Sequence, residues 1–214
     1  MRRLLPDATL RFWAGADGFV NPHHAAARAA SIASANWRAS AAVVAAHLPV
    51  ALFLDIGSTT LDLVPVQGGE VRTSGHDDAE RLRMGELVYT GAGRTPIMAL
   101  VDRVPFAGEW APVLAEHFAT TADVYRLLGT LPESLDQQPA ADGGDKTAEA
   151  SARRLARTIG RDVESAPPEA WRRLAAWIAR AQARRIEDAC DRLLSRGALA
   201  DDAPVVLAGA GRFL

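Results

Sequence analysis

Two short apolar segments joined by a polar turn constrain the fold of this chain more than any other feature. Residues 50–54 form an unbroken apolar run, and residues 61–66 form a second run with Asp62 inside it. Runs of this length indicate strands that are covered on both faces. Because only Asp55-Ile56-Gly57-Ser58-Thr59-Thr60 separates the two runs, we predict a β-hairpin whose tip carries a glycine and three hydroxyl groups.

Helical patterns on either side of this hairpin predict an α/β fold. Residues 23–47 are rich in alanine, and residues 167–197 carry apolar side chains at helical spacing with arginines on the other faces. The other expected elements are a strand at 10–14, helices at 113–128 and 147–159, a Pro/Gly/Asp-rich loop at 131–146 and a buried strand at 204–208. We therefore predict a single α/β domain over residues 1–214, with the hairpin at 50–66 and a helical part at 113–197.

The charge balance and the cysteine count exclude several classes of function. The chain has 24 basic and 26 acidic residues, so no excess of positive charge draws it to nucleic acid or anionic membranes. A single cysteine, Cys190, rules out an intramolecular disulfide and a cysteine-cluster metal site, and it fits a reducing compartment. Residues 39–56 are too interrupted for a membrane span, and residues 1–5 do not develop into a signal peptide. We expect a cytoplasmic protein without nucleic-acid or membrane partners.

The hairpin tip has the composition of a phosphate-binding loop. Gly57 lets the backbone approach a bulky anion, while the hydroxyls of Ser58, Thr59 and Thr60 add donors without adding charge. Asp55, at the end of the first strand, is placed to hold Mg²⁺ directly or through water. The alternative is an ordinary hairpin whose aspartate and serine satisfy turn amides.

A second glycine-containing turn follows the last expected strand. Gly209-Ala210-Gly211 comes directly after residues 204–208, and its small residues would let an adenosine or another flat group lie against the backbone. Glycines after a strand also form ordinary turns, so both interpretations stay open.

These two turns resemble parts of a known superfamily. The hairpin tip and the glycine turn are similar to the second phosphate loop and the adenosine loop of the acetate/sugar kinase, Hsp70 and actin superfamily. Further blocks in order resemble the hydantoinase/oxoprolinase-related proteins of the tetrahydromethanopterin-linked C1-transfer pathway, over roughly residues 12–214. These blocks are Ala35-Asn36-Trp37, Asp77-Asp78-Ala79-Glu80-Arg81-Leu82, Gly85-Glu86-Leu87-Val88-Tyr89-Thr90-Gly91, Arg94-Thr95-Pro96, Glu116-His117-Phe118-Ala119-Thr120, Ala122-Asp123-Val124-Tyr125, Asp142-Gly143 and Arg154-Leu155-Ala156-Arg157.

The resemblance implies both a fold and a reaction. The fold is a ribonuclease H-like, actin-like ATPase lobe with a mixed sheet and flanking helices. The reaction belongs to methanofuran-type cofactor biosynthesis: it joins an aminomethyl-furan-methyl diphosphate to the phenol of a (γ-glutamyl)tyramine and releases diphosphate. Such a displacement needs a diphosphate cradle, a cation on the leaving group and a base near the phenol. The expected partners are these small-molecule substrates.

Binding roles follow for the hairpin. Residues 57–60 would donate hydrogen bonds to diphosphate, and Asp55 and Asp62 would hold Mg²⁺. Because Asp62 alternates with Leu61 and Leu63, we expect it to lie on the opposite face of the strand from those leucines.

Catalytic roles follow for three charged residues outside the hairpin. Arg94 is a candidate for binding diphosphate or a substrate carboxylate, and Glu86 or Asp78 is a candidate for accepting the phenolic proton. A surface ion pair or a helix cap is the alternative for each. Gly209 and Gly211 would form a nucleotide-like loop, and a role for ATP stays open.

The chain also departs from the superfamily pattern. Members have two related lobes with a hairpin each, whereas we find one hairpin here, so we expect the first lobe to be largely missing. Leu61 stands where members tend to have another threonine, which makes the phosphate cradle poorer. Three interpretations stay open: the diphosphate-displacing transferase, a small-molecule kinase or ATPase, and a shortened, inactive protein that binds a partner or itself through an uncovered face.

Overall fold

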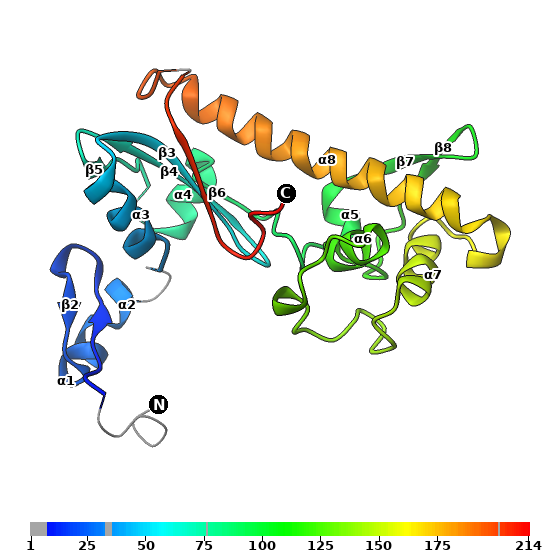
Figure 1. The fold of residues 1–214 in the computed structure, drawn as a ribbon, viewed down its shortest axis with the longest axis horizontal. Coiled ribbons are helices and arrows are strands. Elements are labelled where there is room, and N and C mark those ends of the chain that lie inside the picture. Colours follow the sequence, from blue (N-terminus) through cyan, green and yellow to red (C-terminus); the bar gives the residue numbers. More distant parts are fainter. Residues whose placement is uncertain (1–7, 33–35, 76, 201) are drawn as a thin grey trace.

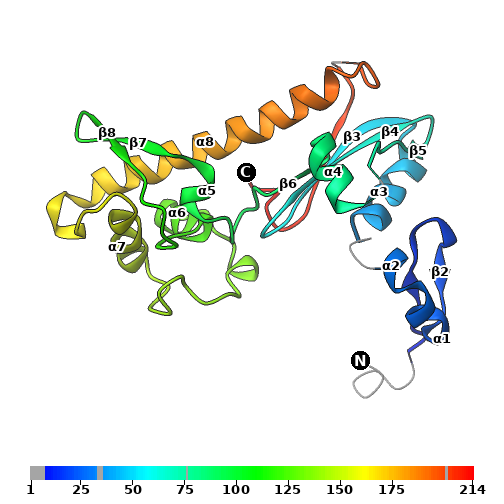
Figure 2. The same ribbon diagram turned by 180° about the vertical axis from the view of Figure 1, so that it is seen from behind.

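A computed structural model describes residues 8–32, 36–75, 77–200 and 202–214. The interpretation of residues 1–5, and residues 33–35 of the expected first helix, lie outside this range. Figures 1 and 2 show two main parts, a β-sheet with helices against it and a mainly helical part, with the long helix α8 (Pro168–Leu194) running across both. We call them the sheet region and the helical region.

The sheet region is built on the predicted hairpin. β3 (Val50–Ile56) and β4 (Leu61–Gln67) pair antiparallel, while β9 (Val205–Ala208) pairs with β3 in parallel. β5 (Glu70–Val71) and β6 (Leu87–Val88) pair with β4. The strand order is β5-β4-β3-β9, which confirms an α/β fold with a mixed sheet flanked by helices.

Helices cover both faces of this sheet. Helix α3 (Asn36–His47) packs its Trp37 and Ala41 against Phe53 and Val64. Leu52 and Leu54 alternate with Phe53 and therefore face the other side, where they join a cluster with residues of α8. Coverage on both sides explains why these strands read as continuous apolar runs.

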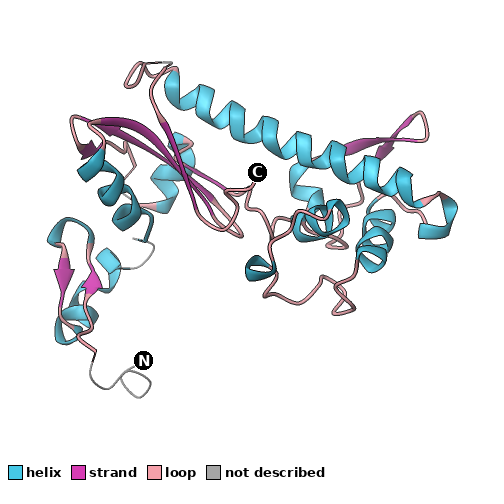
Figure 3. Ribbon diagram, viewed as in Figure 1, coloured by secondary structure: helices cyan, strands magenta, loops and turns pink. Residues whose placement is uncertain are grey.

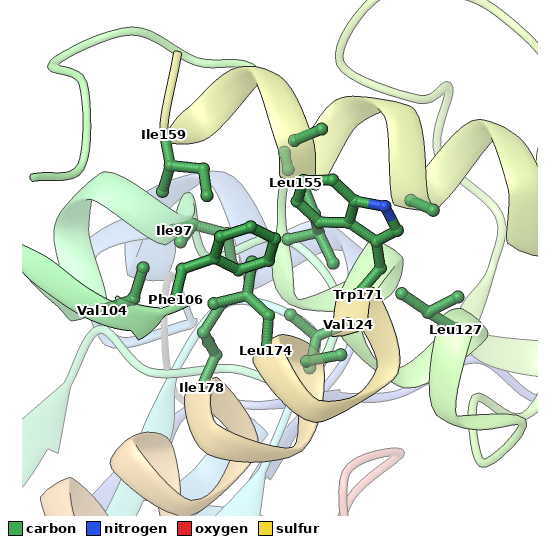
Figure 4. Packing of buried hydrophobic residues seen from close by; sticks show 14 residues of the cluster. Ile97, Val104, Phe106, Val124, Leu127, Leu155, Ile159, Trp171, Leu174 and Ile178 are labelled. Atoms are coloured by element: carbon green, nitrogen blue, oxygen red, sulfur yellow. The ribbon is translucent and has the colours of Figure 1, made fainter. Parts of the chain in front are cut away.

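The helical region has its own core. It contains α5 (Ile97–Leu100), α6 (Thr121–Leu128), α7 (Ala148–Thr158) and a hairpin of β7 (Arg103–Phe106) and β8 (Glu109–Pro112). Phe106 stacks on Trp171 of α8, with ring centroids 4.6 Å apart, at the centre of the cluster in Figure 4. The first half of α8 therefore packs in this region and its second half on the sheet.

Two helix predictions are wrong in their bounds. The helix expected at 113–128 begins only at Thr121, because Thr120 and Asp123 form a capping box that fixes its start. In the helix expected at 23–47, a 3₁₀ turn at Ala26–Arg28 separates α1 (Pro22–Ala25) from α2 (Ala29–Ile32), and α3 is described from Asn36.

Smaller elements complete the chain. The strand expected at 10–14 is β1 (Phe12–Trp13), which pairs with β2 (Phe19–Val20), and α4 (Asp78–Met84) leads into β6. Figure 3 shows how little regular structure lies between α6 and α7. In the described part of the chain, no helix combines the length and apolar character needed to cross a membrane.

Candidate functional site

The hairpin tip between β3 and β4 is a tight loop at the surface. The amide of Gly57 donates to the carbonyl of Thr60 at 2.8 Å, which closes the turn. The four residues 57–60 are all half-buried, and the hydroxyls of Ser58 and Thr59 lie 3.5 Å apart. The loop is therefore not enclosed in apolar interior, and its polar atoms can be reached from solvent.

A second segment, residues 91–94, holds the loop from one side. The amides of Gly91 and Ala92 donate to the carbonyls of Thr59 and Gly57, each at 3.0 Å. Those of Gly93 and Arg94 both donate to the Ser58 carbonyl, at 3.0 and 2.7 Å. We call residues 91–94 the brace. A Cβ on Gly91 would lie 2.2 Å from the Thr59 nitrogen, so only glycine allows this close approach.

The brace determines where the loop amides point. The peptide bonds are trans and planar, so each N–H points opposite to the carbonyl of the preceding residue. Since the carbonyls of residues 57, 58 and 59 face the brace, the N–H groups of Ser58, Thr59 and Thr60 point away from it. Among the described residues these three amides have no protein acceptor. Three free amides in sequence form a concave site for an anion.

Two carboxylates lie beside the loop on one face of the sheet. Asp55 of β3 and Asp62 of β4 are direct cross-strand partners and share the face covered by α3. This confirms that Asp62 lies on the opposite face of the sheet from Leu61 and Leu63. Asp62 forms an ion pair of 2.9 Å with Arg81, whose guanidinium lies over the Trp37 ring at 3.7 Å.

The environment raises the pKa of both carboxylates. For Asp55 the cause is desolvation by burial. For Asp62, burial again raises the pKa most; Arg81 opposes it, and the charges of Asp55 and Asp78 add to it. A divalent cation would relieve this repulsion, and Mg²⁺ commonly uses one or two carboxylates and keeps its waters. Across the described residues no group of three or more metal-ligating side chains occurs. Such an ion would therefore be held by Asp55 and Asp62 together with water or the diphosphate.

The glycine turn after β9 lies against the end of β3. Gly211 donates its amide to the Ile56 carbonyl at 2.7 Å. A Cβ on Gly209 would lie 2.3 Å from that carbonyl oxygen and 2.5 Å from Oδ1 of Asp55. These glycines therefore allow the turn to pack beside Asp55, and their use by a flat ligand stays a prediction.

The two candidate bases have different surroundings. Glu86 is fully buried and accepts from the amides of Ser74 and Gly75, at 2.8 and 3.0 Å, and from Arg196 at 2.9 Å. Asp78 is exposed, in the first turn of α4. The structure thus surrounds Glu86 with donors and leaves Asp78 accessible to a substrate.

Arg94 lies at the brace, apart from the free amides. Its side chain is exposed and lines a pocket of about 250 Å³ together with residues of α6 and of the 131–146 loop. The backbone amide of Arg94 donates to the Ser58 carbonyl, so the backbone from which this side chain extends is bonded directly to the phosphate loop.

A residue that the sequence analysis did not select, Gln182, supports the brace. It is buried in the middle of α8 and donates to the carbonyls of Thr90 and Gly91, at 3.1 and 3.0 Å. Tyr125 of α6 donates to its side-chain oxygen at 2.7 Å. Gln182 follows Ile178 by four residues in the apolar stripe of α8. A polar residue in such a stripe is the sequence feature that could have identified it as a buried hydrogen-bonding residue.

Comparison with known proteins identifies the family. The sequence model for Hydantoinase/oxoprolinase matches residues 3–214. A relative from Methanocaldococcus jannaschii, named "(4-{4-[2-(gamma-L-glutamylamino)ethyl]phenoxymethyl}furan-2-yl)methanamine synthase", is 33% identical over 147 residues, which are 68% of this chain and 44% of the relative. A protein of the same name from Methanococcus vannielii is 37% identical over 82 residues, 38% of this chain and 36% of the relative. The matches span less than half the length of these relatives, and the chain belongs to the hydantoinase/oxoprolinase family.

Proposed function

We propose that this chain carries the diphosphate-binding part of a transferase of methanofuran-type cofactor biosynthesis. The reaction joins an aminomethyl-furan-methyl diphosphate to the phenol of a (γ-glutamyl)tyramine, and both named relatives are synthases whose product contains that aryl ether. The observation that carries the proposal is the row of three free amides at Ser58, Thr59 and Thr60 beside Asp55. We further propose an actin-like ATPase-type lobe, a cytoplasmic location and a place in tetrahydromethanopterin-linked C1 metabolism.

The proposed chemistry is a substitution at the furan methylene carbon. The phenol oxygen forms a bond to this carbon while the carbon–oxygen bond to diphosphate breaks, and diphosphate leaves with the bonding pair. The amides of residues 58–60 stabilise the charge that grows on the leaving group, because they are fixed by the brace before the reaction begins. Mg²⁺, held through Asp55 and Asp62, would neutralise further charge on the diphosphate when bound.

The phenolic proton needs an acceptor, because the ordinary pKa of a phenol is about 10. We propose Asp78 for this role. It is exposed, and its charge acts on Asp62, whereas Glu86 already accepts three hydrogen bonds. A general base must come within hydrogen-bond reach of its proton, which an exposed side chain permits.

The test is a reaction of the purified chain with the furan diphosphate, γ-glutamyl-tyramine and Mg²⁺, followed by mass spectrometry. The expected result is the aryl ether together with an equal amount of released diphosphate. Gly91→Ala should abolish both, since its Cβ displaces the loop, and Asp102→Asn, an exposed carboxylate in the helical region, is the matched control. A folded chain that binds neither diphosphate nor Mg²⁺ would contradict the proposal.

The second candidate is a small-molecule kinase or ATPase. The observation in its favour is the glycine turn at Gly209 and Gly211, which packs directly beside Asp55. Mg²⁺-dependent hydrolysis of ATP without any furan diphosphate would favour this function. Product formation that ATP does not change would exclude it.

A further inference from the structure

The pocket beside Arg94 lies on the brace side of the phosphate loop, opposite to the free amides. It has a volume of about 250 Å³. Its walls mix apolar and polar groups from the brace, α6 and the 131–146 loop. The apolar ones include Pro96, Ala122 and Leu135, and the polar ones include His117, Thr120 and Gln138. Space of this size suits one small substituent rather than a whole cofactor.

Ion pairs fix the outer wall of this pocket. Arg126 of α6 bonds Asp123 at 3.0 Å and Asp136 of the loop at 2.9 Å. Asp136 also pairs with Lys146 at 3.2 Å, and Arg154 of α7 bonds Asp142 of the loop at 3.0 Å and Asp123 at 2.8 Å. The loop is therefore held against α6 and α7, and the pocket is formed before a ligand arrives.

These pairs leave one arginine without an acidic partner. The other charged lining residues, Asp123, Arg126 and Asp136, are neutralised by one another and by their neighbours. Arg94 has no hydrogen-bond or ion-pair partner for its guanidinium among the described residues. A planar guanidinium beside a small pocket of mixed polar and apolar lining matches a carboxylate on a small polar organic group.

The direction of the loop amides decides which part of a substrate can reach this pocket. Diphosphate on the free amides lies on the far side of the loop from Gly93 and Arg94, whose own amides bond the Ser58 carbonyl. A ring attached directly to that diphosphate would therefore stay on the amide side. To reach the brace side, a substrate group would have to pass around the four-residue loop, which only the distal end of a longer second substrate could do.

We propose that this pocket binds the carboxylate-bearing γ-glutamyl end of the acceptor, with Arg94 pairing with the carboxylate. This inference rests on the proposed function for the identity of the acceptor. It assigns Arg94 to recognition of the acceptor and not of the diphosphate, and it makes the pocket the part of the site that distinguishes γ-glutamyl-tyramine from tyramine.

Calorimetric titrations of the 214-residue chain test this assignment with three probes: γ-glutamyl-tyramine, tyramine, and inorganic diphosphate with Mg²⁺. Arg94→Gln should weaken the binding of γ-glutamyl-tyramine about tenfold, which is the effect of losing one charge-assisted hydrogen bond. It should leave the other two probes unchanged. Arg94→Lys keeps the charge without the planar fork and should restore part of the affinity. Arg83→Gln, which removes another exposed arginine, is the control and should change nothing.

A second pair of variants tests the pocket itself. Ala141→Trp fills the pocket and should weaken the binding of γ-glutamyl-tyramine without changing the affinity for diphosphate. Ala148→Trp lies on a different pocket beside α7 and should change neither affinity. Equal affinity of the wild type for both amines, or an effect of Arg94→Gln on diphosphate alone, would overturn the inference and leave the proposed function standing. Failure of diphosphate to bind the wild-type chain would instead count against the proposed function.

Discussion

The two regions of the molecule use their charged side chains differently. In the helical region, Asp123 is fully buried and accepts from Arg126, Ser151 and Arg154, so its charge is matched by the protein itself. In the sheet region, Asp55 has no cationic partner among the described residues, and three neighbouring amides are free. The first arrangement stabilises the fold, and the second leaves binding capacity for a ligand.

A carboxylate that the protein supplies with donors is structural, and one that lacks them is available for chemistry. Both regions contain aspartates that sequence inspection alone cannot rank. Burial with donors lowers the free energy of the ionised form, and burial without them raises it. The comparison therefore predicts opposite outcomes for removing an aspartate in the two regions.

The largest expected effect is on stability, at Asp123. Asp123→Ala leaves the buried guanidinium of Arg154 without its main partner and removes the capping box of α6. Breaking a buried pair from one side costs about 3–5 kcal/mol, so we expect a loss of that size in the free energy of unfolding. Urea denaturation measures it, and a change below about 1 kcal/mol would show that Asp142 or solvent replaces Asp123.

Asp55→Asn should give the opposite pattern. We expect Mg²⁺-dependent diphosphate binding to fall about a hundredfold or more, since Asp55 is the less buried member of the proposed metal pair and has no cationic partner among the described residues. The free energy of unfolding should stay the same or rise slightly, because a desolvated charge is removed. Titration calorimetry and urea denaturation of the same preparation provide the two measurements. Unchanged affinity would remove Asp55 from the site.

Gln182→Leu tests the link between the regions. It leaves the hydroxyl of Tyr125 and the carbonyl of Thr90 each without a side-chain partner, while Gly91 keeps the hydroxyls of Thr95 and Thr121. Unsatisfied buried groups cost about 1–3 kcal/mol, and diphosphate affinity should fall as the brace loosens. Gln182→Glu is the sharper variant: its loss of diphosphate affinity relative to the wild type at the same pH should shrink as the pH falls, because the protonated acid can donate to the brace. A pH-independent loss would mean that Gln182 only supports packing.

The raised pKa values of Asp55 and Asp62 predict the pH dependence. Metal binding needs the ionised forms of both carboxylates. The affinity for Mn²⁺, measured by electron paramagnetic resonance without diphosphate, should therefore decline as the pH falls, with a midpoint above pH 3.8. In the folded chain these two groups hold protons more tightly than in the unfolded chain, so they favour folding as the pH falls through the raised pKa. A midpoint at or below 3.8 would contradict this account.

Asp136 of the helical region should respond in the opposite direction. Burial alone would raise its pKa, but hydrogen bonds and charges from Arg126 and Lys146 outweigh burial, and the pKa lies below 3.8. Its contribution to stability is fully present above pH 3.8, the ordinary pKa of the group, and is lost as the pH falls through the lowered pKa of the folded chain. Asp136→Asn should therefore flatten the acid limb of a stability profile, and an unaltered profile would show that the pairs with Arg126 and Lys146 contribute little.

The smallest expected effect is at the exposed pair of Glu149 and Arg153. Their side chains are 80% and 49% exposed, and they lie one helical turn apart on α7. Such pairs contribute about 0.3–0.5 kcal/mol, so Glu149→Gln should barely change the urea midpoint. A larger loss would mean that the contrast between buried and exposed charges in the helical region is smaller than described.

Local patterns were sufficient to predict the hairpin, its polar tip and the long helix. The alternation of Asp62 with leucines also gave the correct face. The start of α6 was missed although Thr120 and Asp123 have the spacing of a capping box. The β7–β8 hairpin was missed because its turn, Ala107-Gly108, adopts positive φ at an alanine, which the usual Asn-Gly rule does not anticipate.

Features that depend on distant contacts could not be predicted in this way. Glu86 was a candidate base because a carboxylate can accept a proton, but its donors Ser74, Gly75 and Arg196 come from other parts of the chain. The order of the 131–146 loop depends likewise on pairs with α6 and α7. No local periodicity encodes which charge meets which.

The central claim is tested most directly by nuclear magnetic resonance of the labelled chain during titration with inorganic diphosphate and Mg²⁺. We expect the amide signals of Ser58, Thr59 and Thr60 to shift most, while those of Gly91 to Arg94, which are bonded to carbonyls, shift less. Saturating shifts confined to other residues, with these three amides unmoved, would contradict it.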